Sequence, residues 1–391
     1  MKKIIYIWLV KLISKLKHEK KPENIVYLMS FNGNVNFIKE LSKLADNKHS
    51  LTVLYLPQCQ NDANKLNKIG IKTVKFQNNI DFLIHKLPFI LNAQLLICDN
   101  YYAFLSGIGF DHDKTHVVQI WHANGAVKSF GWDEPQTLKR SKSDKKRFQR
   151  VYNQFDEFIV GSTMMGEVFQ RSYHISKEKI SLLGYPRTDN LFNCKWQSKT
   201  LDKIYYRHPE LKGKEILLYA PTYREDENHK VKLELPIDLD LILKQLNKNQ
   251  KLIIKLHPHL IKEEKNLKQR FQDEHLIWID DFSTNDLLLI TDRLITDYSS
   301  VIFDYTLLPN AKQIILYCYD FKEYKENIGI QKDFQEWAPG PIVTSEAELN
   351  SIIKKPLKRA NFDKFNIKWN TFNDGNATER VIKHEENYLH S

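Results

Sequence analysis

The feature of this sequence that most limits its fold is a series of short, continuous apolar runs separated by polar segments that permit helices. Strands that are buried on both faces of a parallel sheet read as unbroken apolar runs rather than as alternating ones. The runs expected to form strands are 25–31, 51–57, 95–102, 116–122, 158–162 and 180–186, followed by 216–222, 252–258, 276–280, 294–300 and 313–320. Alternating strands and helices predict a layered α/β fold, and the two successive sets predict two Rossmann-like halves.

The length of the chain agrees with two domains, because 391 residues exceed the ~150 residues of a typical single domain. We expect an N-terminal helix within 1–21, a first domain over 22–200 and a second domain over 201–391. The polar tail 355–391 has a helical pattern near its end and could return to the first domain. The sequence leaves the oligomeric state open, and a homo-oligomer is compatible with it.

The net charge of +10 is concentrated in two clusters. Residues 2–21 contain seven Lys against one Glu, and residues 139–150 contain seven Lys or Arg against Asp144, so each cluster carries +6 and the rest sums to −2. A protein that coats nucleic acid would spread its basic residues over the surface. We therefore expect two basic patches on a near-neutral body and no nucleic-acid partner.

The N-terminal cluster is predicted to form a basic amphipathic helix. One side would carry Ile5, Trp8, Leu9, Leu12, Ile13 and Leu16, and the other Lys11, Ser14, Lys15 and His18. Such a helix can lie on an anionic membrane, and the alternative is a helix docked on the protein's own core. The residues expected at the membrane surface are Lys2, Lys3, Trp8, Lys11, Lys15 and Lys17.

The cysteine content and the hydropathy together favour a reducing, cytoplasmic location. The four Cys are too widely spaced for a metal knuckle and too few for a disulfide framework. No apolar run reaches the ~18–20 residues that span a bilayer. Any membrane association is thus expected to be peripheral, on the cytoplasmic side.

The polar segments that follow strands are the candidate sites, because ligands of open α/β sheets bind where strands end and helices begin. The run 116–122 places His122 at the end of an expected strand. A turn with Asn124 and Gly125 follows, and then Lys128. Histidine has a usual pKa of ~6.5 and can accept a proton from an alcohol. A buried His satisfied by a backbone carbonyl is the structural alternative.

Three strand ends in the second half have side chains suited to phosphate. Arg224 is a fixed cation, unless it forms a solvated pair with Glu225, and Lys255 shares a strand face with His257. Ser299 and Ser300 would open a helix whose first N–H groups attract anions, or would merely cap it. The candidate residues of these segments are Pro221, Thr222, Arg224, Lys255, His257, Thr296, Ser299, Ser300 and Asp304. No carboxylate or Cys near His257 completes a metal site, so no metal is expected.

Five segments in order resemble the CDP-glycerol glycerophosphotransferase family of teichoic acid synthesis. They are 119–131, 184–191, 218–226, 255–259 and 295–305, and the resemblance covers roughly 90–345. The pattern from 97 to 131 looks most like the glycerol-phosphate primase branch. Many relatives read Trp-His-Gly where this chain has Ala123 and Asn124 before Gly125. Polymerising members carry a large extra domain for which this chain has no room, which also favours a primase over a polymerase.

The resemblance implies a GT-B-like pair of Rossmann-type domains facing a central cleft, with CDP-glycerol in the second and the acceptor in the first. It implies transfer of sn-glycerol 3-phosphate from CDP-glycerol to a hydroxyl of the undecaprenyl-pyrophosphate-linked GlcNAc-ManNAc disaccharide, with release of CMP. CDP-glycerol is then a co-substrate, and no bound cofactor is implied.

The resemblance also assigns roles to the candidate residues. His122 would be the general base, and Lys255, His257, Arg224, Ser299 and Ser300 would hold the pyrophosphate. Thr222 and Asp304 would contact other polar groups of the donor. Arg187 of the second segment lies either in the site or in an interdomain salt bridge. A second-step glycerol- or ribitol-phosphate transferase, a GT-B glycosyltransferase that uses a nucleotide sugar, and a non-catalytic polyanion-binding protein are the alternatives.

Overall fold

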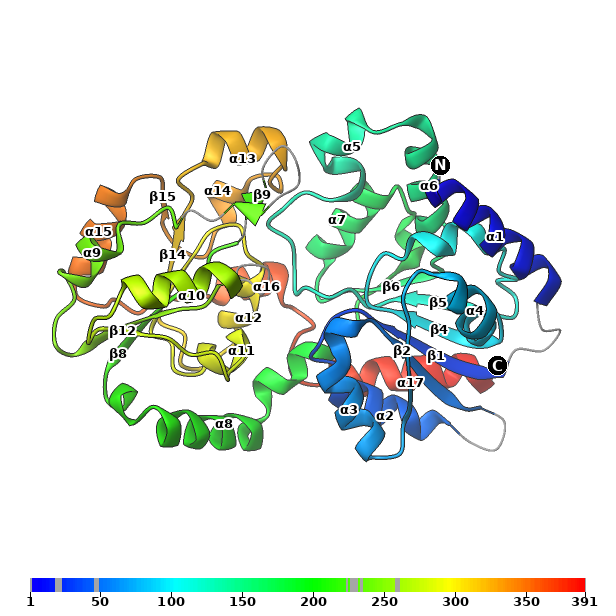
Figure 1. Cartoon of the computed structure of the whole chain (residues 1–391), viewed down its shortest axis with the longest axis horizontal. Coiled ribbons are helices and arrows are strands. Elements are labelled where there is room, and N and C mark those ends of the chain that lie inside the picture. The colour runs from blue at the N-terminus through cyan, green and yellow to red at the C-terminus, as the bar shows by residue number, and fades with distance from the viewer. Residues whose placement is uncertain are drawn as a thin grey trace. The chain divides into compact units, whose positions relative to one another are not determined.

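The computed structural model describes residues 2–17, 23–45, 49–222, 224–225, 231–232, 235–256 and 261–390. The chain folds into two compact units (Figure 1). The first contains Met1–Asn124, Phe130–Asn190 and Trp369–Ser391, and the second contains Gly125–Ser129 and Leu191–Lys368. A short turn of the first half of the sequence is therefore part of the second unit, and the C-terminal segment is part of the first.

The first unit is built on a seven-stranded parallel sheet with the order β3-β2-β1-β4-β5-β6-β7. Its strands are β1 (Asn24–Met29), β2 (Leu51–Tyr55), β3 (Lys72–Lys75), β4 (Ala93–Cys98), β5 (His116–Gln119), β6 (Glu157–Ile159) and β7 (Ile180–Ser181). All residues of β2 are buried, as its continuous apolar run predicts. The edge strand β3 was not expected, because its sequence KTVK is short and polar and its two ends are exposed.

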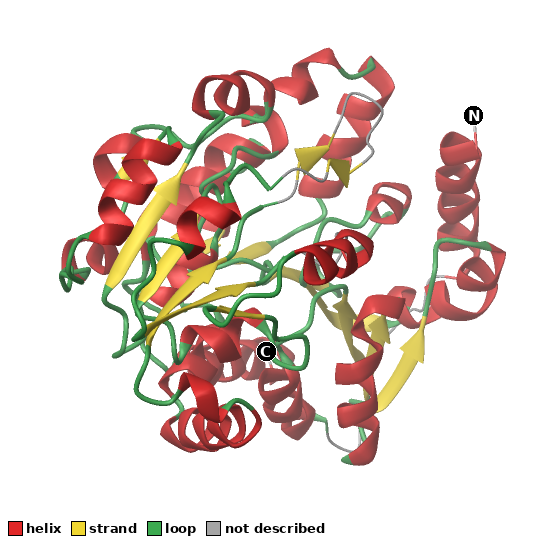
Figure 2. Cartoon of the chain, turned by 60° about the vertical axis from the view of Figure 1, so that its left-hand side comes forward, coloured by secondary structure: helices red, strands yellow, loops and turns green. Residues whose placement is uncertain are grey.

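Helices flank the strands (Figure 2), and the following ones belong to the first unit. They are α1 (Lys2–Lys17), α2 (Val35–Leu41), α3 (Gln60–Lys68), α4 (Leu87–Leu91), α5 (Pro135–Lys139), α6 (Lys142–Tyr152), α7 (Thr163–Tyr173) and α17 (Ala377–His390). The short helical turns used below are η3 (Phe82–Lys86), η4 (Ala103–Gly107) and η7 (Pro186–Phe192). Val381 and Leu389 of α17 are buried in the same core as β1, β2 and α2. The C-terminal helix is thus an integral part of the first unit.

The second unit is built on a six-stranded parallel sheet with the order β12-β11-β8-β13-β14-β15. Its strands are β8 (Glu215–Tyr219), β11 (Gln250–Ile254), β12 (Leu276–Ile277), β13 (Arg293–Thr296), β14 (Gln313–Tyr317) and β15 (Ile342–Val343). Two further strands, β9 (Arg224–Glu225) and β10 (Val231–Lys232), form a small antiparallel ribbon. The expectation of an α/β fold with two parallel sheets is confirmed.

The helices of the second unit include one, α8, that the expected boundary at residue 200 would divide. They are α8 (Cys194–Arg207), α9 (Leu239–Leu243), α10 (Ile261–Arg270), α11 (Thr284–Leu288), α12 (Val301–Tyr305), α13 (Phe321–Asn327), α14 (Phe334–Trp337), α15 (Glu346–Lys354) and α16 (Asp363–Trp369). The division between the units falls between Asn190 and Leu191 rather than at residue 200. The reason is that α8 packs on the second unit, where Arg207 pairs with Asp281.

The N-terminal helix docks on the first unit, which corrects the expected arrangement of its faces. Ser14, expected on the polar outer side, is only 2% exposed, and Val10 is completely buried. Val10 packs on η4, where a Cβ on Gly107 would lie 2.7 Å from the carbonyl oxygen of Ile7 and 3.0 Å from Val10 Cγ1. Small residues at this contact allow the close approach, which hydrophobic periodicity alone does not reveal.

The outer face of α1 is apolar. Ile4, Ile5, Trp8, Leu12 and Leu16 are exposed, and Lys11 and Lys15 are exposed beside them. The side chains of Lys2, Lys3 and Lys17 lie outside the described residues. Within the part of the chain that is described, no helix combines the length and the apolar character that a membrane crossing requires.

Candidate functional site

Each sheet has one point at which the chain reverses the direction in which strands are added. In the first unit this switch point lies between β1 and β4, and in the second it lies between β8 and β13. Ligands of doubly wound sheets bind outside the carboxyl ends of the strands at such points. The residues that follow these four strands therefore define the candidate site in each unit.

Asp99, which directly follows β4, organises the switch point of the first unit. This carboxylate is completely buried and accepts hydrogen bonds from the Ser30 N–H (2.8 Å) and hydroxyl (2.8 Å), the Phe31 N–H (2.9 Å) and the Tyr102 hydroxyl (2.9 Å). Burial raises the pKa of Asp99 to about 6, although these bonds favour the charged form. Asp99 thus ties the segment after β4 to the segment after β1.

His122 lies beside Asp99 and uses only one ring nitrogen in its contacts with the described residues. Its Nδ1 is 3.2 Å from the carbonyl oxygen of Asp99. Since a carbonyl only accepts, Nδ1 carries the proton and Nε2 keeps its lone pair. The ring stacks on Phe31, with centroids 3.9 Å apart and planes inclined by 10°.

The electrostatic surroundings keep His122 neutral. Burial lowers its pKa to about 4, and the positive charge of Arg187 acts in the same direction, whereas the bond to Asp99 opposes the shift. The imidazole is therefore uncharged at neutral pH and can accept a proton at Nε2. The contact with a carbonyl, which was the structural alternative for this residue, is the feature that fixes the tautomer.

Trp121 adopts a strained conformation that turns the chain just before His122. Its φ of 56° lies in the left-handed region, which is unfavourable for a bulky residue. The Trp121 N–H donates to Gln119 Oε1 (2.8 Å), and the indole packs against Phe130 and Phe169 with centroids 5.1 and 5.3 Å away. Such strain persists only where surrounding contacts impose it, and it often marks a functional position.

The turn after His122 is divided between the two units. Asn124 is buried in the first unit, where its Oδ1 accepts from Asn373 Nδ2 at 2.6 Å. Its own Nδ2 has no partner among the described residues. Gly125 belongs to the second unit, has a φ of 88°, and a Cβ there would lie 2.6 Å from the ring of Phe303. The Lys128 Nζ lies 5.7 Å from the centroid of the Tyr324 ring.

In the second unit, Asp297 follows β13. Like Asp99 in the first unit, it accepts hydrogen bonds from the segment that follows the neighbouring strand. The Thr222 N–H and hydroxyl donate to the two oxygens of Asp297 at 2.9 and 2.8 Å. Arg224 Nη2 lies 2.9 Å from Asp297 Oδ2. The carboxylate thereby connects the segment after β8 to the segment after β13.

Arg224 is held by two carboxylates inside a group of tyrosines. Its Nε and Nη2 donate to Asp320 at 2.7 and 3.1 Å, in addition to the contact with Asp297. Rings of three tyrosines surround the guanidinium, at 4.7 to 5.4 Å, and they belong to Tyr298, Tyr319 and Tyr324. Although Arg224 is largely buried, its two carboxylate partners raise its pKa above the usual range. Direct binding of phosphate by Arg224 stays a prediction, and it would require an exchange of partners.

The other predicted donor residues of the second unit differ in how their polar groups are used. Thr296 donates to the carbonyl of Ala220 (2.6 Å) and joins β13 to β8, and Lys255 Nζ donates to the carbonyl of Ile279 (3.0 Å). Burial lowers the pKa of Lys255. Ser299 Oγ accepts from the Val301 N–H at 3.3 Å.

The hydroxyl of Ser300 does not cap α12 and lies half-buried at its start. Asp304 is buried one turn further on, and Pro221 is half-buried before Thr222. His257 lies outside the described residues.

Sequence reasoning missed the three carboxylates Asp99, Asp297 and Asp320. A signal for two of them was present, because Asp99 and Asp297 each come directly after a continuous apolar strand. Their importance depends on the strand order, since each accepts bonds from a segment that follows a different strand. Arg187, in η7, is close enough to lower the pKa of His122.

Two doubly wound parallel sheets, each with a buried carboxylate at its switch point, define a GT-B-like α/β enzyme. The chain belongs to the CDP-Glycerol:Poly(glycerophosphate) glycerophosphotransferase family, whose model matches residues 11–384. It is therefore a transferase of teichoic acid biosynthesis, as the resemblance of its five segments predicts.

Two relatives and one solved structure support this assignment. The teichoic acid glycerol-phosphate primase of Bacillus subtilis (strain 168) is 30% identical over 98% of this chain and 97% of that protein. The teichoic acid ribitol-phosphate primase of Bacillus spizizenii (strain ATCC 23059 / NRRL B-14472 / W23) is 31% identical over 79% of this chain and 80% of that protein. The structure of the wall teichoic acid polymerase TagF has the same fold, with a TM-score of 0.72, 22% identity and coverage of 100% of this chain and 95% of that chain.

Proposed function

We propose that this transferase is a linkage-unit primase that moves sn-glycerol 3-phosphate from CDP-glycerol to a sugar hydroxyl of the undecaprenyl-pyrophosphate-linked GlcNAc-ManNAc disaccharide. The observation that carries the proposal is His122, whose Nδ1 is tied to the Asp99 carbonyl so that Nε2 can accept a proton. The similarity to a glycerol-phosphate primase over nearly the whole chain supports the choice of substrates.

In the proposed reaction, His122 Nε2 removes the proton of the acceptor hydroxyl as its oxygen attacks the glycerol-linked phosphorus. The phosphorus–oxygen bond to CMP breaks, and CMP leaves with the electron pair. The Nδ1–H bond to the Asp99 carbonyl strengthens as the imidazole becomes imidazolium. Phosphoryl-type transfer depends mainly on positioning the reactants and on neutralising charge. The fixed tautomer of His122 and the rim of each switch point, meaning the hydrogen-bonded segments that follow its strands, would supply this positioning.

The low pKa of His122, about 4, would make it a weak base in the free protein. A bound pyrophosphate brings negative charge near the ring and raises its pKa toward neutrality. The proton is then accepted efficiently only when donor and acceptor are both in place. This coupling would also limit wasteful hydrolysis of the donor.

The donor is proposed to bind at the switch point of the second unit. The hydroxyls of Ser299 and Ser300 and the Lys255 ammonium would contact its phosphates, together with His257. Thr222 and Asp304 would contact its other polar groups. Arg224, held by Asp297 and Asp320, would support this rim. Neither a metal nor a further cofactor is part of the proposal for this site.

The decisive experiment is incubation with CDP-glycerol and a short-chain lipid-disaccharide analogue, followed by mass spectrometry. A product with one added glycerol phosphate supports the primase, and a ladder of products supports a polymerase. A parallel reaction with CDP-ribitol tests the second candidate, a ribitol-phosphate transferase, which the 31% identity to a ribitol-phosphate primase favours. Turnover of UDP- or GDP-sugars with none of CDP-glycerol would refute both.

The outer face of α1 is proposed to bind an anionic membrane surface on the cytoplasmic side, which would bring the enzyme to its lipid acceptor. Trp8 and Leu16 are 59% and 75% exposed. The second basic cluster lies close by, because α1 and α6 both pack on η4 (Figure 1). Each Lys or Arg near such a surface contributes ~1 kcal/mol, which salt screens.

Substitution on the exposed face tests this orientation better than deletion of the helix, which would uncover the core beneath it. The double variant Trp8→Ser and Leu16→Ser should bind phosphatidylglycerol vesicles several-fold more weakly than the unmodified chain. Ile367→Ser, at an exposed apolar position of the second unit, is the matched control. Equal binding by all three proteins would refute a role of α1.

A further inference from the structure

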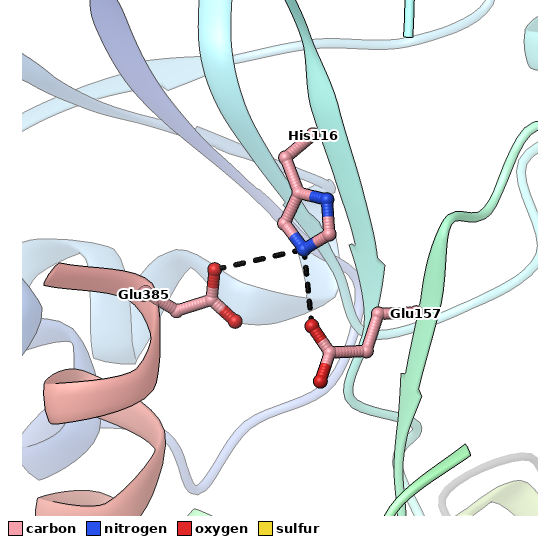
Figure 3. Close-up of side chains that lie close together, drawn as sticks. All are labelled: His116, Glu157 and Glu385. Carbon is pink, nitrogen blue, oxygen red and sulfur yellow. Dashed lines mark hydrogen bonds and ion pairs between the residues drawn. The ribbon is translucent and has the colours of Figure 1, made fainter. Parts of the chain in front are cut away.

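Three side chains from distant parts of the sequence converge at the amino ends of two neighbouring strands of the first sheet (Figure 3). His116 opens β5, Glu157 opens β6, and Glu385 lies on α17. His116 Nε2 is 3.0 Å from Glu157 Oε2 and 3.9 Å from Glu385 Oε2. One ligand atom of each residue lies within 4.8 Å of the others. Two carboxylates thus face a single imidazole nitrogen.

Among the described residues, neither oxygen of Glu385 has a hydrogen-bond partner, although the side chain is completely buried. A buried carboxylate without hydrogen bonds is costly, and native structures normally compensate it with a donor or a cation. His116 lies 3.9 Å away, beyond hydrogen-bond distance, and its Nε2 is already hydrogen-bonded to Glu157. The pairing of Glu385 with His116 is therefore too long to replace a hydrogen bond.

Two neighbouring side chains support the group from outside it. His384 Nε2 lies 2.9 Å from Glu157 Oε1 and 3.1 Å from Oε2. The Nδ1 atom of His116 is 3.9 Å from Asp156 Oδ2, where a carboxylate can orient the ring as partners of metal-bound histidines do. One imidazole and two carboxylates are then grouped around one point.

We propose that His116, Glu157 and Glu385 bind a divalent transition-metal ion, with Zn²⁺ as the best match. Zn²⁺ accepts imidazole nitrogen and carboxylate oxygen at ~2.0–2.2 Å in tetrahedral sites, so its ligand atoms lie ~3.3 Å apart. The measured separations of 3.0 and 3.9 Å lie on either side of that value. Mixed imidazole and carboxylate ligands favour Zn²⁺ over Mg²⁺ or Ca²⁺, which prefer sets of oxygens.

The place of the cluster in the sheet indicates a structural role. His116 is at the amino end of β5, whereas His122 follows the carboxyl end of the same strand, so the ion would not take part in transfer. It would connect α17 to β5 and β6 across chain segments that are remote in sequence. Since the site would form only in the folded unit, its binding energy would stabilise that unit.

The test uses the full chain without a polyhistidine tag. Metal analysis after purification, and again after EDTA dialysis and Zn²⁺ reconstitution, should give about one Zn²⁺ per chain. At a free Zn²⁺ concentration about a hundredfold above Kd, the melting temperature should exceed that of the metal-free protein by about 5 °C. Absence of stoichiometric Zn²⁺ together with an unchanged melting temperature would overturn the proposal.

Glu385→Gln keeps the shape of the side chain and should abolish both Zn²⁺ retention and the Zn²⁺-dependent rise in melting temperature. Glu386→Gln, an exposed neighbour on the same helix, is the matched control and should behave like the unmodified chain. If Glu385 is only a neutral buried carboxyl, Glu385→Gln leaves the melting temperature unchanged or raises it, and Zn²⁺ has no effect on either protein. Should Glu385→Gln fail to fold, His116→Gln, which removes the imidazole of the group, gives the same comparison of Zn²⁺ retention.

Discussion

The proposed role of His122 can be tested with two substitutions, each of which keeps a polar group at the position of only one of the two ring nitrogens. In His122→Asn the amide nitrogen can occupy the place of Nδ1 and keep the bond to the Asp99 carbonyl, which is 3.2 Å long in the structure. The variant lacks an atom at the position of Nε2. His122→Gln is complementary, because its longer side chain can approach the position of Nε2 but loses the contact with Asp99.

The expected magnitudes differ between turnover and binding. Loss of a general base costs about 10²- to 10⁴-fold in rate, which corresponds to about 3–5 kcal/mol of transition-state stabilisation. We expect His122→Asn to lose this factor in kcat, with the KM for CDP-glycerol changed by less than about twofold, because the Asp99 contact and the fold are retained. His122→Gln should also lose stability by about 1–3 kcal/mol, since it leaves a buried carbonyl without its donor.

The pH dependence gives an independent check. His122 must be neutral to accept a proton, so kcat/KM should fall as pH decreases through the pKa of the free protein, which is lowered to about 4. The same shift affects stability. Because the folded pKa lies below the unfolded value of ~6.5, the unfolded chain binds more protons between these two values. The contribution of His122 to stability is therefore fully present above pH ~6.5 and is lost as pH falls toward 4.

The assay is CMP release with the lipid-disaccharide analogue, accompanied by a melting curve for each variant. His174→Asn is a suitable control, because His174 adopts a left-handed conformation at the end of α7 that Asn also tolerates. Near-normal turnover of His122→Asn, or a kcat/KM that does not decrease at low pH, would refute the assignment of His122 as base.

Three further outcomes follow from the site. Gly125→Ala should lower the melting temperature by several degrees, because its φ of 88° and a Cβ 2.6 Å from the Phe303 ring are both unfavourable; an unchanged melting curve would show that this close approach is absent. Arg224→Lys should cost about 1.5–3 kcal/mol for each charge-assisted bond that it loses to Asp320, measured by urea unfolding, and equal stability would mean that the carboxylates are not its partners. Ser300→Ala should weaken CDP-glycerol binding in calorimetry without affecting stability, because its hydroxyl does not cap α12; unchanged affinity would remove Ser300 from the proposed donor site.

The sequence predicts the central strands and the edge strands β7 and β12, but it does not predict the edge strands β3 and β15. Continuous apolar runs locate β1, β2 and β8 because both faces of these strands are buried. The edge strands β3 and β15 have four and two residues and too few apolar positions to form a pattern. On α1, periodicity identifies the helix but misplaces Ser14, since the burial of its inner face depends on packing against segments that are remote in sequence, such as η4 beside Val10.

The residues of the candidate site, too, can be predicted from the sequence only in part. His122 and Thr222 can be found from the sequence because each directly follows a predicted strand. Their partners Asp99 and Asp297 could not be assigned, because the bonds from Ser30 and Thr222 depend on which strands are neighbours in the sheet. The grouping of His116, Glu157 and Glu385 likewise depends on which strands are neighbours, whereas the expectation that no metal binds rested on residues close together in sequence.

The two units have the same arrangement of hydrogen bonds at their switch points, and this similarity links the fold to the proposed chemistry. In the first unit a hydroxyl residue after β1, Ser30, donates its N–H and hydroxyl to the Asp that follows β4. In the second unit Thr222, after β8, donates the same two groups to Asp297, which follows β13. Each carboxylate makes the rim of its switch point rigid at the place where a ligand of a doubly wound sheet binds.

The two rims differ in what they hold. The backbone carbonyl of Asp99 fixes the tautomer of a neutral imidazole, which suits removal of a proton from an alcohol. The side chain of Asp297 helps to fix a guanidinium, which suits a site for a polar, charged donor. In the proposed reaction, a single topological feature, repeated in both units, would therefore support two different tasks: activation of the acceptor in the first unit and positioning of the donor in the second.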